Sequence, residues 1–511
     1  MKKILFTLAA ACFLGGSALA ESKMVLVRGG TFLMGSPASE RMRDADEAQH
    51  SVTVDDFYCD AFEVRQSDYE KLMGENPSYN KGANLPVENV SFYDALEYCN
   101  KKSVAEGLAA VYKIDGKNAK FPFSNVSVDL AADGYRLLTE AEWEYACRAG
   151  TTTIFSTGNW NNPKDANYEG SYPYLIEENY VRRTNPNVQP GLNRGKTISV
   201  DSLAPNAFGL FNMHGNVSEW VFDYYGGYDD SISSPDVAGA AGIGRSGGKN
   251  ASGMGGKSVL NPLGSAVGIY RVNRGGGFND FGKHLRSAYR SASNPLTKDR
   301  NLGFRIARNA GKRNVASASE NRKNTAINNG VFETKYDEKV ASISVPKNPH
   351  VLVAYFSYSG NAESAAEYIS KSLKSKFGEE KVDLVEIEMQ NPYRGVIYDA
   401  SQRDLMNGTR PPLKTKIAAA KMAEYDVVLL GYPIWWATLP MPVCTFLESC
   451  DFYGKTVISF SSHGGTIYGD SVSDLSKHLL KSYLGLPFEF FYSGGRDLNA
   501  RIDEWLKESG L

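Results

Sequence analysis

The stretch VLVAYFSYSGNA, residues 351–362, decides the fold of the C-terminal part of the chain. It opens with six consecutive apolar residues, Val351 to Phe356, a pattern typical of a strand that is buried on both faces of a parallel sheet. A small-residue turn then directs several backbone N–H groups, and the positive end of the next helix, at one point. The stretch therefore predicts a phosphate-binding loop without Lys or Arg. The helix that follows is predicted from an apolar side formed by Ala362, Ala365, Ala366, Ile369 and Leu373.

Two more predicted strands end in unusual loops. The strand at 425–433 leads into IWWATLP, residues 434–440, and the strand at 456–462 leads into HGGTIYG, residues 463–469. In a doubly wound sheet, ligands bind outside the carboxyl ends of the strands, where all three loops lie. The remaining predicted elements of this half are strands at 382–388 and 488–492 and a closing helix at 498–507.

These loops resemble those of the flavodoxin family, whose first loop holds the phosphate of FMN with a T/S-x-T/S-G-N-T pattern. Ala362 replaces the last hydroxyl of that pattern. The resemblance implies a doubly wound α/β sheet of strand order 2-1-3-4-5, with Trp435 or Trp436 stacked on the isoalloxazine and the third loop at its other edge. The residues that it assigns to FMN binding are Ser357, Tyr358, Ser359, Gly360, Asn361, Ala362, Pro433, Trp435, Trp436, His463, Gly464, Gly465 and Tyr468.

Length and charge limit the classes of protein to consider. A chain of 511 residues is too long for one core and indicates two or three domains. The net charge of −2 argues against a nucleic-acid or anionic-membrane partner, since no basic surplus is available to displace counterions.

Residues 1–20 have the pattern of a secretory signal peptide. Lys2 and Lys3 precede an apolar run at 4–14, and Ala18-Leu19-Ala20 forms a small-x-small cleavage site. The run is too short for a permanent membrane span. We therefore expect export to the periplasm or the medium, with no integral membrane segment after cleavage. Five cysteines would remain, and an odd number leaves at least one thiol without an internal partner, although a Cys99–Cys147 bridge stays open.

Several phrases in residues 24–308 resemble the sulfatase-modifying-factor family, which has the fold of the formylglycine-generating enzyme. This resemblance implies an irregular α+β domain over residues 21–308, related in shape to C-type lectins. The residues of one stretch also make physical sense as a helix start, because Thr139 and Glu142 form a capping box for a helix that carries Trp143 and Tyr145. The phrases are MVLVRGGTFLMGS (24–36), LPVENVSFYDALEYC (85–99), GYRLLTEAEWEYACRAG (134–150), NAFGLFNMHGNVSEW (206–220) and 271–307, which ends in NLGFRIA.

The active enzymes of that family oxidise a substrate cysteine to formylglycine with copper held by two cysteines. The two matching positions here are Asp280 and Leu285. Leucine cannot ligate a metal, and Cu(I) prefers thiolate sulfur. We therefore do not expect formylglycine-generating activity.

The family also binds calcium through an N-x-x-G-x-x-x-E stretch. The matching residues are Asn212, Gly215, Val217 (through its carbonyl) and Glu219. Two side-chain and two carbonyl oxygens suit a hard cation such as Ca²⁺. The alternative is that Asn216, Glu219 and Trp220 only brace a loop, and the sequence does not choose between the two.

Residues 309–348 are polar at their start and lack apolar periodicity, so we expect a flexible linker with a short ordered piece at 331–345. The linker would tether the flavodoxin-like domain, 349–511, which we expect to fold independently and to contact the other half only modestly.

Three functions remain open. The first is an FMN-dependent redox protein, either an electron carrier or an oxidoreductase acting on a small substrate, in which the flavin supplies the chemistry. The second is a non-catalytic binding or scaffold protein. The third is a peptide- or protein-modifying enzyme in residues 24–308 that the flavin domain serves. The redox partner or substrate cannot be named from the sequence.

Overall fold

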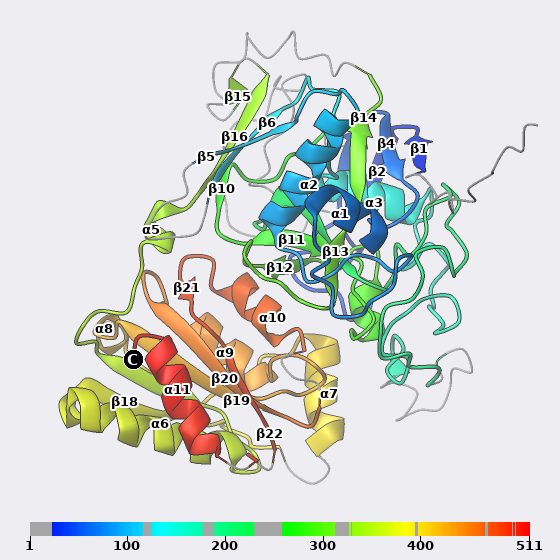
Figure 1. Ribbon diagram of the computed structural model, residues 1–511. Helices are drawn as coiled ribbons and strands as arrows, with labels where there is room; N and C mark the ends of the chain where they lie inside the picture. The colour runs from blue at the N-terminus through cyan, green and yellow to red at the C-terminus, as the bar shows by residue number, and fades with distance from the viewer. Residues whose placement is uncertain are drawn as a thin grey trace, which may run out of the picture.

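The computed structural model describes residues 23–115, 124–176, 188, 190–228, 258–311, 327–328, 330–393, 397–465, 469–492, 494–495 and 497–511. The chain forms two bodies that pack against each other, with the short helix α5 (Glu338–Ala341) between them in Figure 1. The first body is an irregular α+β domain and the second is an α/β sandwich, as the sequence predicts.

Among its described residues, the N-terminal domain combines short strands, three helices and long loops. Its sheets have the orders β1-β4-β14-β7, β2-β3-β9, β12-β11-β8-β13 and β10-β16-β6-β5. Its helices are α1 (Gln66–Met73), α2 (Phe92–Ala105) and α3 (Glu140–Arg148), with a 3₁₀ turn, η3, at Gly282–Leu285. Its strands are β1 (Met24–Val27), β2 (Gly30–Met34), β3 (His50–Val54), β4 (Phe57–Asp60), β5 (Tyr112–Asp115), β6 (Asn125–Asp129), β7 (Tyr135–Leu137), β8 (Ser218–Tyr224), β9 (Val259–Leu260), β10 (Val267–Gly268), β11 (Arg271–Arg274), β12 (Ser291–Ser293), β13 (Leu302–Phe304), β14 (Ile306–Asn309), β15 (Ile327–Asn328) and β16 (Val331–Tyr336).

The predicted capping box begins α3. The Glu142 backbone N–H donates to Thr139 Oγ1 over 3.2 Å, and the Thr139 N–H donates to Glu142 Oε2 over 3.0 Å. This fixes the start of the helix, so that the fully buried Trp143 faces the core. The prediction for this helix is confirmed.

Buried arginine–glutamate pairs hold the loop-rich domain together. Arg286 lies 2.6 Å from Glu47, and Arg305 lies 2.7 Å from Glu219. The guanidinium of Arg305 also donates to the carbonyls of Asp60, Ala61 and Phe211, so it ties the end of β4 to a distant loop. Removing one partner of such a pair typically costs about 3–5 kcal/mol, because the other charge is left buried.

The C-terminal domain is a parallel sheet between helices. The sheet has the order β18-β17-β19-β20, with β21 at the start of β20 and β22 at its end. The predicted strand order 2-1-3-4-5 is therefore confirmed. Its strands are β17 (Val351–Tyr355), β18 (Val382–Glu386), β19 (Val427–Pro433), β20 (Thr456–His463), β21 (Tyr483–Leu484) and β22 (Phe488–Phe491); its helices are α6 (Asn361–Phe377), η5 (a 3₁₀ turn, Glu379–Lys381), α7 (Ile397–Asn407), α8 (Ala419–Ala423), α9 (Met441–Ser449), α10 (Ser471–His478) and α11 (Leu498–Glu508).

Part of the expected linker, 309–348, is ordered, within the piece at 331–345 that the sequence predicts. Its residues 331–336 form β16, which pairs antiparallel with β6 and parallel with β10 of the N-terminal domain. Phe332 and Thr334 point inward and are buried, while Glu333 and Lys335 point outward and are exposed. This alternation is typical of a strand with one buried face, and the pairing of that strand with the N-terminal sheet was not predicted because its partners are distant in sequence. Residues 312–326 lie outside the described residues.

The two domains also touch along α10, which lies at their boundary in Figure 1. Ser473 Oγ accepts a 2.9 Å hydrogen bond from the Ala292 N–H of β12, and Lys477 Nζ lies 3.0 Å from Asp44 Oδ2. Tyr483 and Leu484 of β21 pack against the core of the N-terminal domain. We call these contacts the seam. The seam is a direct contact between two domains that the sequence predicts to touch only modestly.

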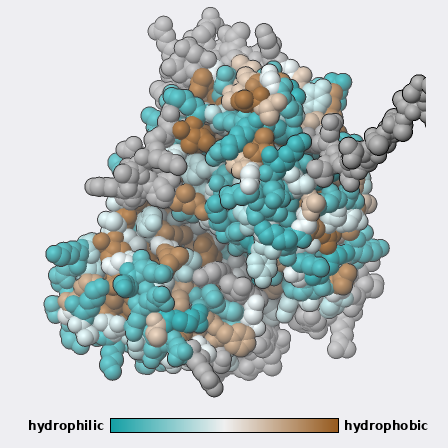
Figure 2. All heavy atoms as spheres, viewed as in Figure 1, coloured by the Kyte–Doolittle hydropathy of each residue, from teal (hydrophilic) through white to brown (hydrophobic). Residues whose placement is uncertain are grey.

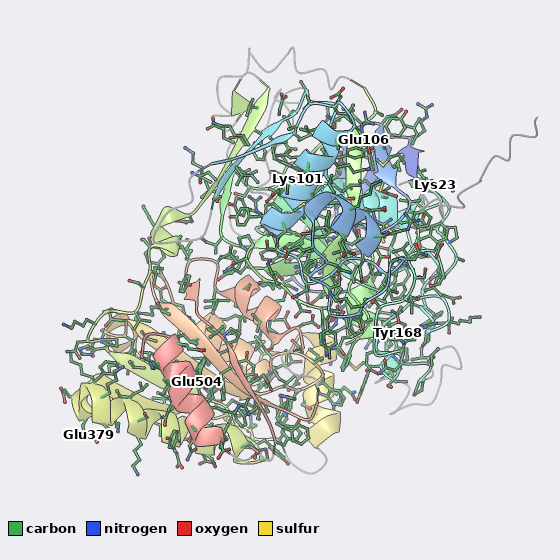
Figure 3. All side chains as sticks on the ribbon, in the orientation of Figure 1. Lys23, Lys101, Glu106, Tyr168, Glu379 and Glu504 are labelled. Atoms are coloured by element: carbon green, nitrogen blue, oxygen red, sulfur yellow. The ribbon has the colours of Figure 1, made fainter. Side chains whose placement is uncertain are left out.

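The outer surface is largely polar. On the face in Figure 2, hydrophobic residues are scattered among hydrophilic ones. Charged residues such as Lys101 on α2 and Glu504 on α11 lie on this outer surface in Figure 3, and Lys101 pairs with Glu97 at 2.9 Å. Among the described residues, no helix has the length and apolar character required to cross a membrane. The five cysteines of the described residues, Cys59, Cys99, Cys147, Cys444 and Cys450, are free thiols.

Candidate functional site

The three special loops meet at one edge of the C-terminal sheet. β17, β19 and β20 are parallel neighbours, with Tyr355 opposite Gly431 and Pro433 opposite Ser462. Their carboxyl ends therefore point the same way, and the loops that follow them lie side by side. Pro433 ends β19 and is buried.

The first loop leads directly into α6. Gly360 is the residue before the helix, with φ of 84°, and no side chain caps the first-turn N–H groups. Those groups remain available to an anion, and the helix dipole favours negative charge there. Ser357 is half-buried, Tyr358 and Ser359 are exposed, and Asn361 Nδ2 donates to Ser359 Oγ over 3.0 Å.

Ala362 occupies a different environment from the rest of the loop. It is buried at the start of α6, on the helix that places Ala365 and Ile369 in the core. The loop can thus offer backbone N–H groups and the hydroxyls of Ser357 and Ser359, but no hydroxyl at position 362.

The second loop contains a left-handed turn that begins at its second tryptophan. Trp436 and Ala437 have φ of 56° and 57°, a conformation that large side chains rarely adopt and that often marks functional sites. Trp436 Nε1 donates to Ser401 Oγ of α7 over 3.2 Å. Both indoles are half-buried, so neither is fully withdrawn into the core.

Trp435 is surrounded by aromatic rings that meet it at an angle. The rings of Phe356, Tyr358 and Tyr393 lie 5.4, 6.1 and 6.0 Å from it, at interplanar angles of 85°, 74° and 55°. None of these three stacks face to face on the indole. A flat ring could stack on it in the way that aromatic systems prefer.

The third loop is braced by a histidine. His463 is buried, its Nδ1 accepts from the Gly465 N–H over 3.0 Å, and its Nε2 donates to Glu489 of β22. Both ring nitrogens are engaged, and among the described residues of this loop Gly464, Gly465 and Gly469 are exposed. Tyr468 lies outside the described residues.

Sequence reasoning missed Ser401 and Glu489 as supporting residues. Ser401 positions Trp436 from a helix in the stretch that follows β18, and Glu489 fixes the orientation of His463. Neither residue lies in a recognisable motif, because each acts only through a partner distant in sequence.

The predicted calcium residues lie together in the loop and strand at 212–219. Asn212 Nδ2 donates to Glu63 over 2.9 Å, while Asn212 Oδ1 is buried without a hydrogen-bond partner among the described residues. An orphaned acceptor oxygen fits a cation site. The Glu219 carboxylate, however, is engaged by Arg305 at 2.7 Å and by Trp143 Nε1 at 2.9 Å. The fit is therefore partial.

Comparisons with known proteins identify a matching family for each of the two domains. Residues 15–310 match the model of the Sulfatase-modifying factor enzyme 1-like domain, and residues 350–505 match that of Flavodoxin. The chain belongs to the sulfatase-modifying-factor family. It carries a flavodoxin domain at its C-terminal end.

Two curated relatives match the N-terminal part. The chain is 33% identical over 228 residues to "Chaperone protein LppX" of Paenibacillus barcinonensis, covering 42% of this chain and 76% of the relative. It is 29% identical over 323 residues to the formylglycine-generating enzyme of Mus musculus, covering 57% of this chain and 77% of the relative.

Solved structures match each domain separately. "Treponema denticola variable protein 1" is 25% identical with a TM-score of 0.42, covering 56% of this chain and 94% of that one. A flavoprotein in complex with FMN from Lactobacillus acidophilus NCFM is 21% identical with a TM-score of 0.24, covering 31% of this chain and 99% of that one.

Proposed function

We propose that this protein is an FMN-binding redox protein, which transfers electrons or reduces a small substrate through its flavodoxin domain. The observation that supports this best is the convergence of three loops at one sheet edge. There an uncapped helix N-terminus, suited to a phosphate, lies beside a half-buried indole, suited to a flat ring. FMN carries both groups and supplies the redox chemistry when bound.

The residues of this chain would bind, orient and shield the cofactor. The first loop would hold the phosphate with backbone N–H groups and serine hydroxyls, and Trp435 would cover one face of the ring. His463, locked by Glu489, would fix the backbone of Gly464 and Gly465 at the other edge. The net charge of −2 does not favour a nucleic acid as the partner.

A titration of FMN into the apo protein tests the proposal. We expect quenching of flavin fluorescence with a one-to-one endpoint, and weaker binding of riboflavin, which lacks the phosphate. Trp435→Ala should weaken FMN binding by roughly 3- to 10-fold, the equivalent of one aromatic stacking contact. Tyr453→Ala is the matched control, because Tyr453 is an exposed aromatic residue elsewhere in the same domain.

Unchanged flavin fluorescence at micromolar protein would refute FMN binding and favour the scaffold alternative. Equal loss of affinity in Trp435→Ala and Tyr453→Ala would refute the stacking role alone.

The third alternative, a peptide-modifying N-terminal domain that the flavin serves, is favoured by one observation: the seam joins the two domains along α10, next to the third loop.

We propose that the N-terminal domain lacks copper-dependent formylglycine chemistry. Asp280 and Leu285 stand at the two expected copper positions, and Leu285 is fully buried among apolar side chains. Mass spectrometry of a C-x-P-x-R peptide incubated with the protein, copper and oxygen should show no aldehyde product. Conversion of the cysteine would contradict this.

We also propose calcium as a structural ion at Asn212, Gly215, Val217 and Glu219. Glu219 would then have to share its carboxylate between the ion and Arg305. Thermal unfolding in Ca²⁺ and in chelator decides the question, since an ion that binds only the native state must raise the melting temperature. Identical melting in both would exclude the site.

We also propose that the protein is exported from the cytoplasm. Export is supported by the charged start, apolar run and small-x-small site of residues 1–20. N-terminal sequencing of the protein from its native cells should begin at Glu21. Recovery of the chain with Met1 from the cytosol would exclude it.

A further inference from the structure

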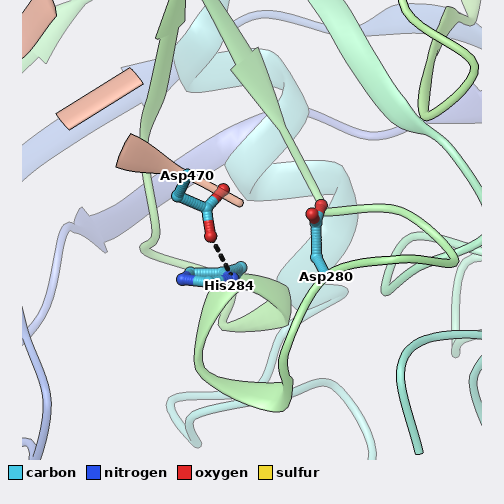
Figure 4. Close-up of side chains that lie close together, drawn as sticks. All are labelled: Asp280, His284 and Asp470. Atoms are coloured by element: carbon cyan, nitrogen blue, oxygen red, sulfur yellow. Dashed lines mark ion pairs between the residues drawn. The ribbon is translucent and has the colours of Figure 1, made fainter. Parts of the chain in front are cut away.

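Three potential metal ligands from the two domains meet at the seam. Asp280 lies on the loop after β11, His284 lies in η3, and Asp470 is the residue before α10 of the other domain. One ligand atom from each lies within 4.8 Å of the other two. Figure 4 shows the three side chains gathered at one place, with His284 Nδ1 and Asp470 Oδ2 2.6 Å apart.

Local structure directs each carboxylate toward this place. Asp280 accepts a 2.7 Å hydrogen bond from the Gly277 N–H, which fixes its orientation. Asp470 stands at the N-cap of α10, where an aspartate usually accepts from the first-turn N–H groups, yet it makes no such bond. Its carboxylate is turned to His284 instead.

Protein groups satisfy the cluster only in part. His284 is fully buried; its Nδ1 faces Asp470 and also accepts a 3.3 Å hydrogen bond from the Phe281 N–H, while its Nε2 has no hydrogen-bond partner among the described residues. Burying two carboxylates and an imidazole together is costly unless a cation or hydrogen bonds compensate. Lys477 is already paired with Asp44 at 3.0 Å, so its charge is shared with a group outside the cluster.

We propose that Asp280, His284 and Asp470 form a divalent transition-metal site that exists only when the two domains are docked. One imidazole and two carboxylates suit Zn²⁺ in particular, because purely oxygen sites favour Ca²⁺ or Mg²⁺ and thiolate sites favour Cu(I). Three protein ligands leave the fourth tetrahedral position open. The separation of about 3.4 Å between ligand atoms around such an ion lies between the observed 2.6 Å of His284 and Asp470 and the 4.8 Å limit of the trio.

The other acidic cluster nearby does not compete for this role. Asp44, Asp46 and Glu47 also lie within reach of one another. Arg286 binds Glu47 at 2.6 Å, Lys477 binds Asp44, and the Tyr225 hydroxyl donates to Asp46 over 2.7 Å. Protein groups therefore already neutralise that cluster.

Zn²⁺ binding to the full chain without FMN tests the site independently of the proposed flavin function. Competition with a chromophoric chelator would be measured in a Cys450→Ser background, which removes the partly exposed thiol, and with millimolar Ca²⁺ to occupy oxygen-only sites. We expect one equivalent of Zn²⁺. Asp280→Asn and Asp470→Asn, from different domains, should each weaken binding at least tenfold. Asp474→Asn, one turn along the same helix and outside the trio, should not.

Co²⁺ gives a second readout, since ligation by nitrogen and oxygen yields visible d–d bands without a thiolate charge-transfer band. Circular dichroism of each variant shows that it is folded. Absence of saturable Zn²⁺ binding to the folded parent would overturn the proposal and leave an ion pair only. Equal binding by the parent and both asparagine variants, or equal loss in Asp474→Asn, would overturn the ligand assignment.

Discussion

Burial strongly shifts the pKa of one carboxyl group in the N-terminal domain, that of Asp223. Asp223 lies on β8 and is almost fully buried, with its Oδ2 accepting a 2.8 Å hydrogen bond from the Glu140 N–H. Burial, followed by repulsion from the Glu140 carboxylate, raises the pKa of Asp223 to about 8. The native state thus keeps a proton that the unfolded chain releases at a pKa near 3.8.

Because of Asp223, we expect the free energy of unfolding to fall as the pH rises. The contribution of Asp223 is fully present below about pH 4 and is lost as pH rises through about 8, at up to about 1.4 kcal/mol per pH unit. Asp223→Asn keeps the acceptor oxygen and cannot ionise, so its melting temperature should fall less between pH 5 and 8 than that of the parent. Calorimetry across that range checks it, with the exposed Asp129→Asn as control. Parallel curves for all three proteins would contradict the prediction.

At the scale of elements, backbone contact couples the second and third loops. Gly469 has φ of 51°, and a Cβ there would lie 2.3 Å from the Ala437 carbonyl oxygen. The same oxygen accepts a 2.7 Å hydrogen bond from the Asp470 N–H. The indole loop and the start of α10 are therefore fixed to each other.

Gly469→Ala should separate these elements. Its matched control is Gly454→Ala, because Gly454 also has positive φ, of 74°, but has open space around its Cα. Both substitutions place alanine in the left-handed region, at about 1–2 kcal/mol, and only the first adds a clash. We expect a larger drop in melting temperature for Gly469→Ala and at least tenfold weaker FMN binding in that variant alone. Equal effects of the two substitutions would mean that the loops are not coupled.

For the whole molecule, the domains are held by two different kinds of contact. The first is the pairing of β16 with strands of the N-terminal domain. The second is the seam, which contributes the ion pair of Lys477 with Asp44 and the apolar packing of β21. Which of these two contacts still holds the fragments together therefore depends on where the chain is cleaved.

Site-specific protease sites can be placed on either side of β16. After cleavage between Ala318 and Ser319, the fragments should co-elute in size exclusion even at 1 M salt, because β16 remains in the N-terminal sheet. After cleavage between Lys347 and Asn348, only the seam remains, and high salt should promote separation by screening its charges. Separation of the first pair at low salt would mean that β16 does not hold the domains together.

The sequence by itself determined the features that depend on neighbours along the chain. The apolar run at 351–356, the small-residue turn, the apolar side of α6 and the capping box of Thr139 and Glu142 all appear as predicted, because strand burial, helix periodicity and capping are local. Parallel strand order also followed, since alternating strands and helices permit few arrangements.

Only the tertiary structure decided how distant segments meet. It assigned β16 to the N-terminal sheet, placed Arg305 on Glu219, and brought Asp470 against His284. These contacts join residues 86 or more positions apart, and each depends on the shape and charge of two complete surfaces. No local pattern encodes such complementarity, because a charged or polar residue acquires its partner only when the surfaces that carry the two residues dock.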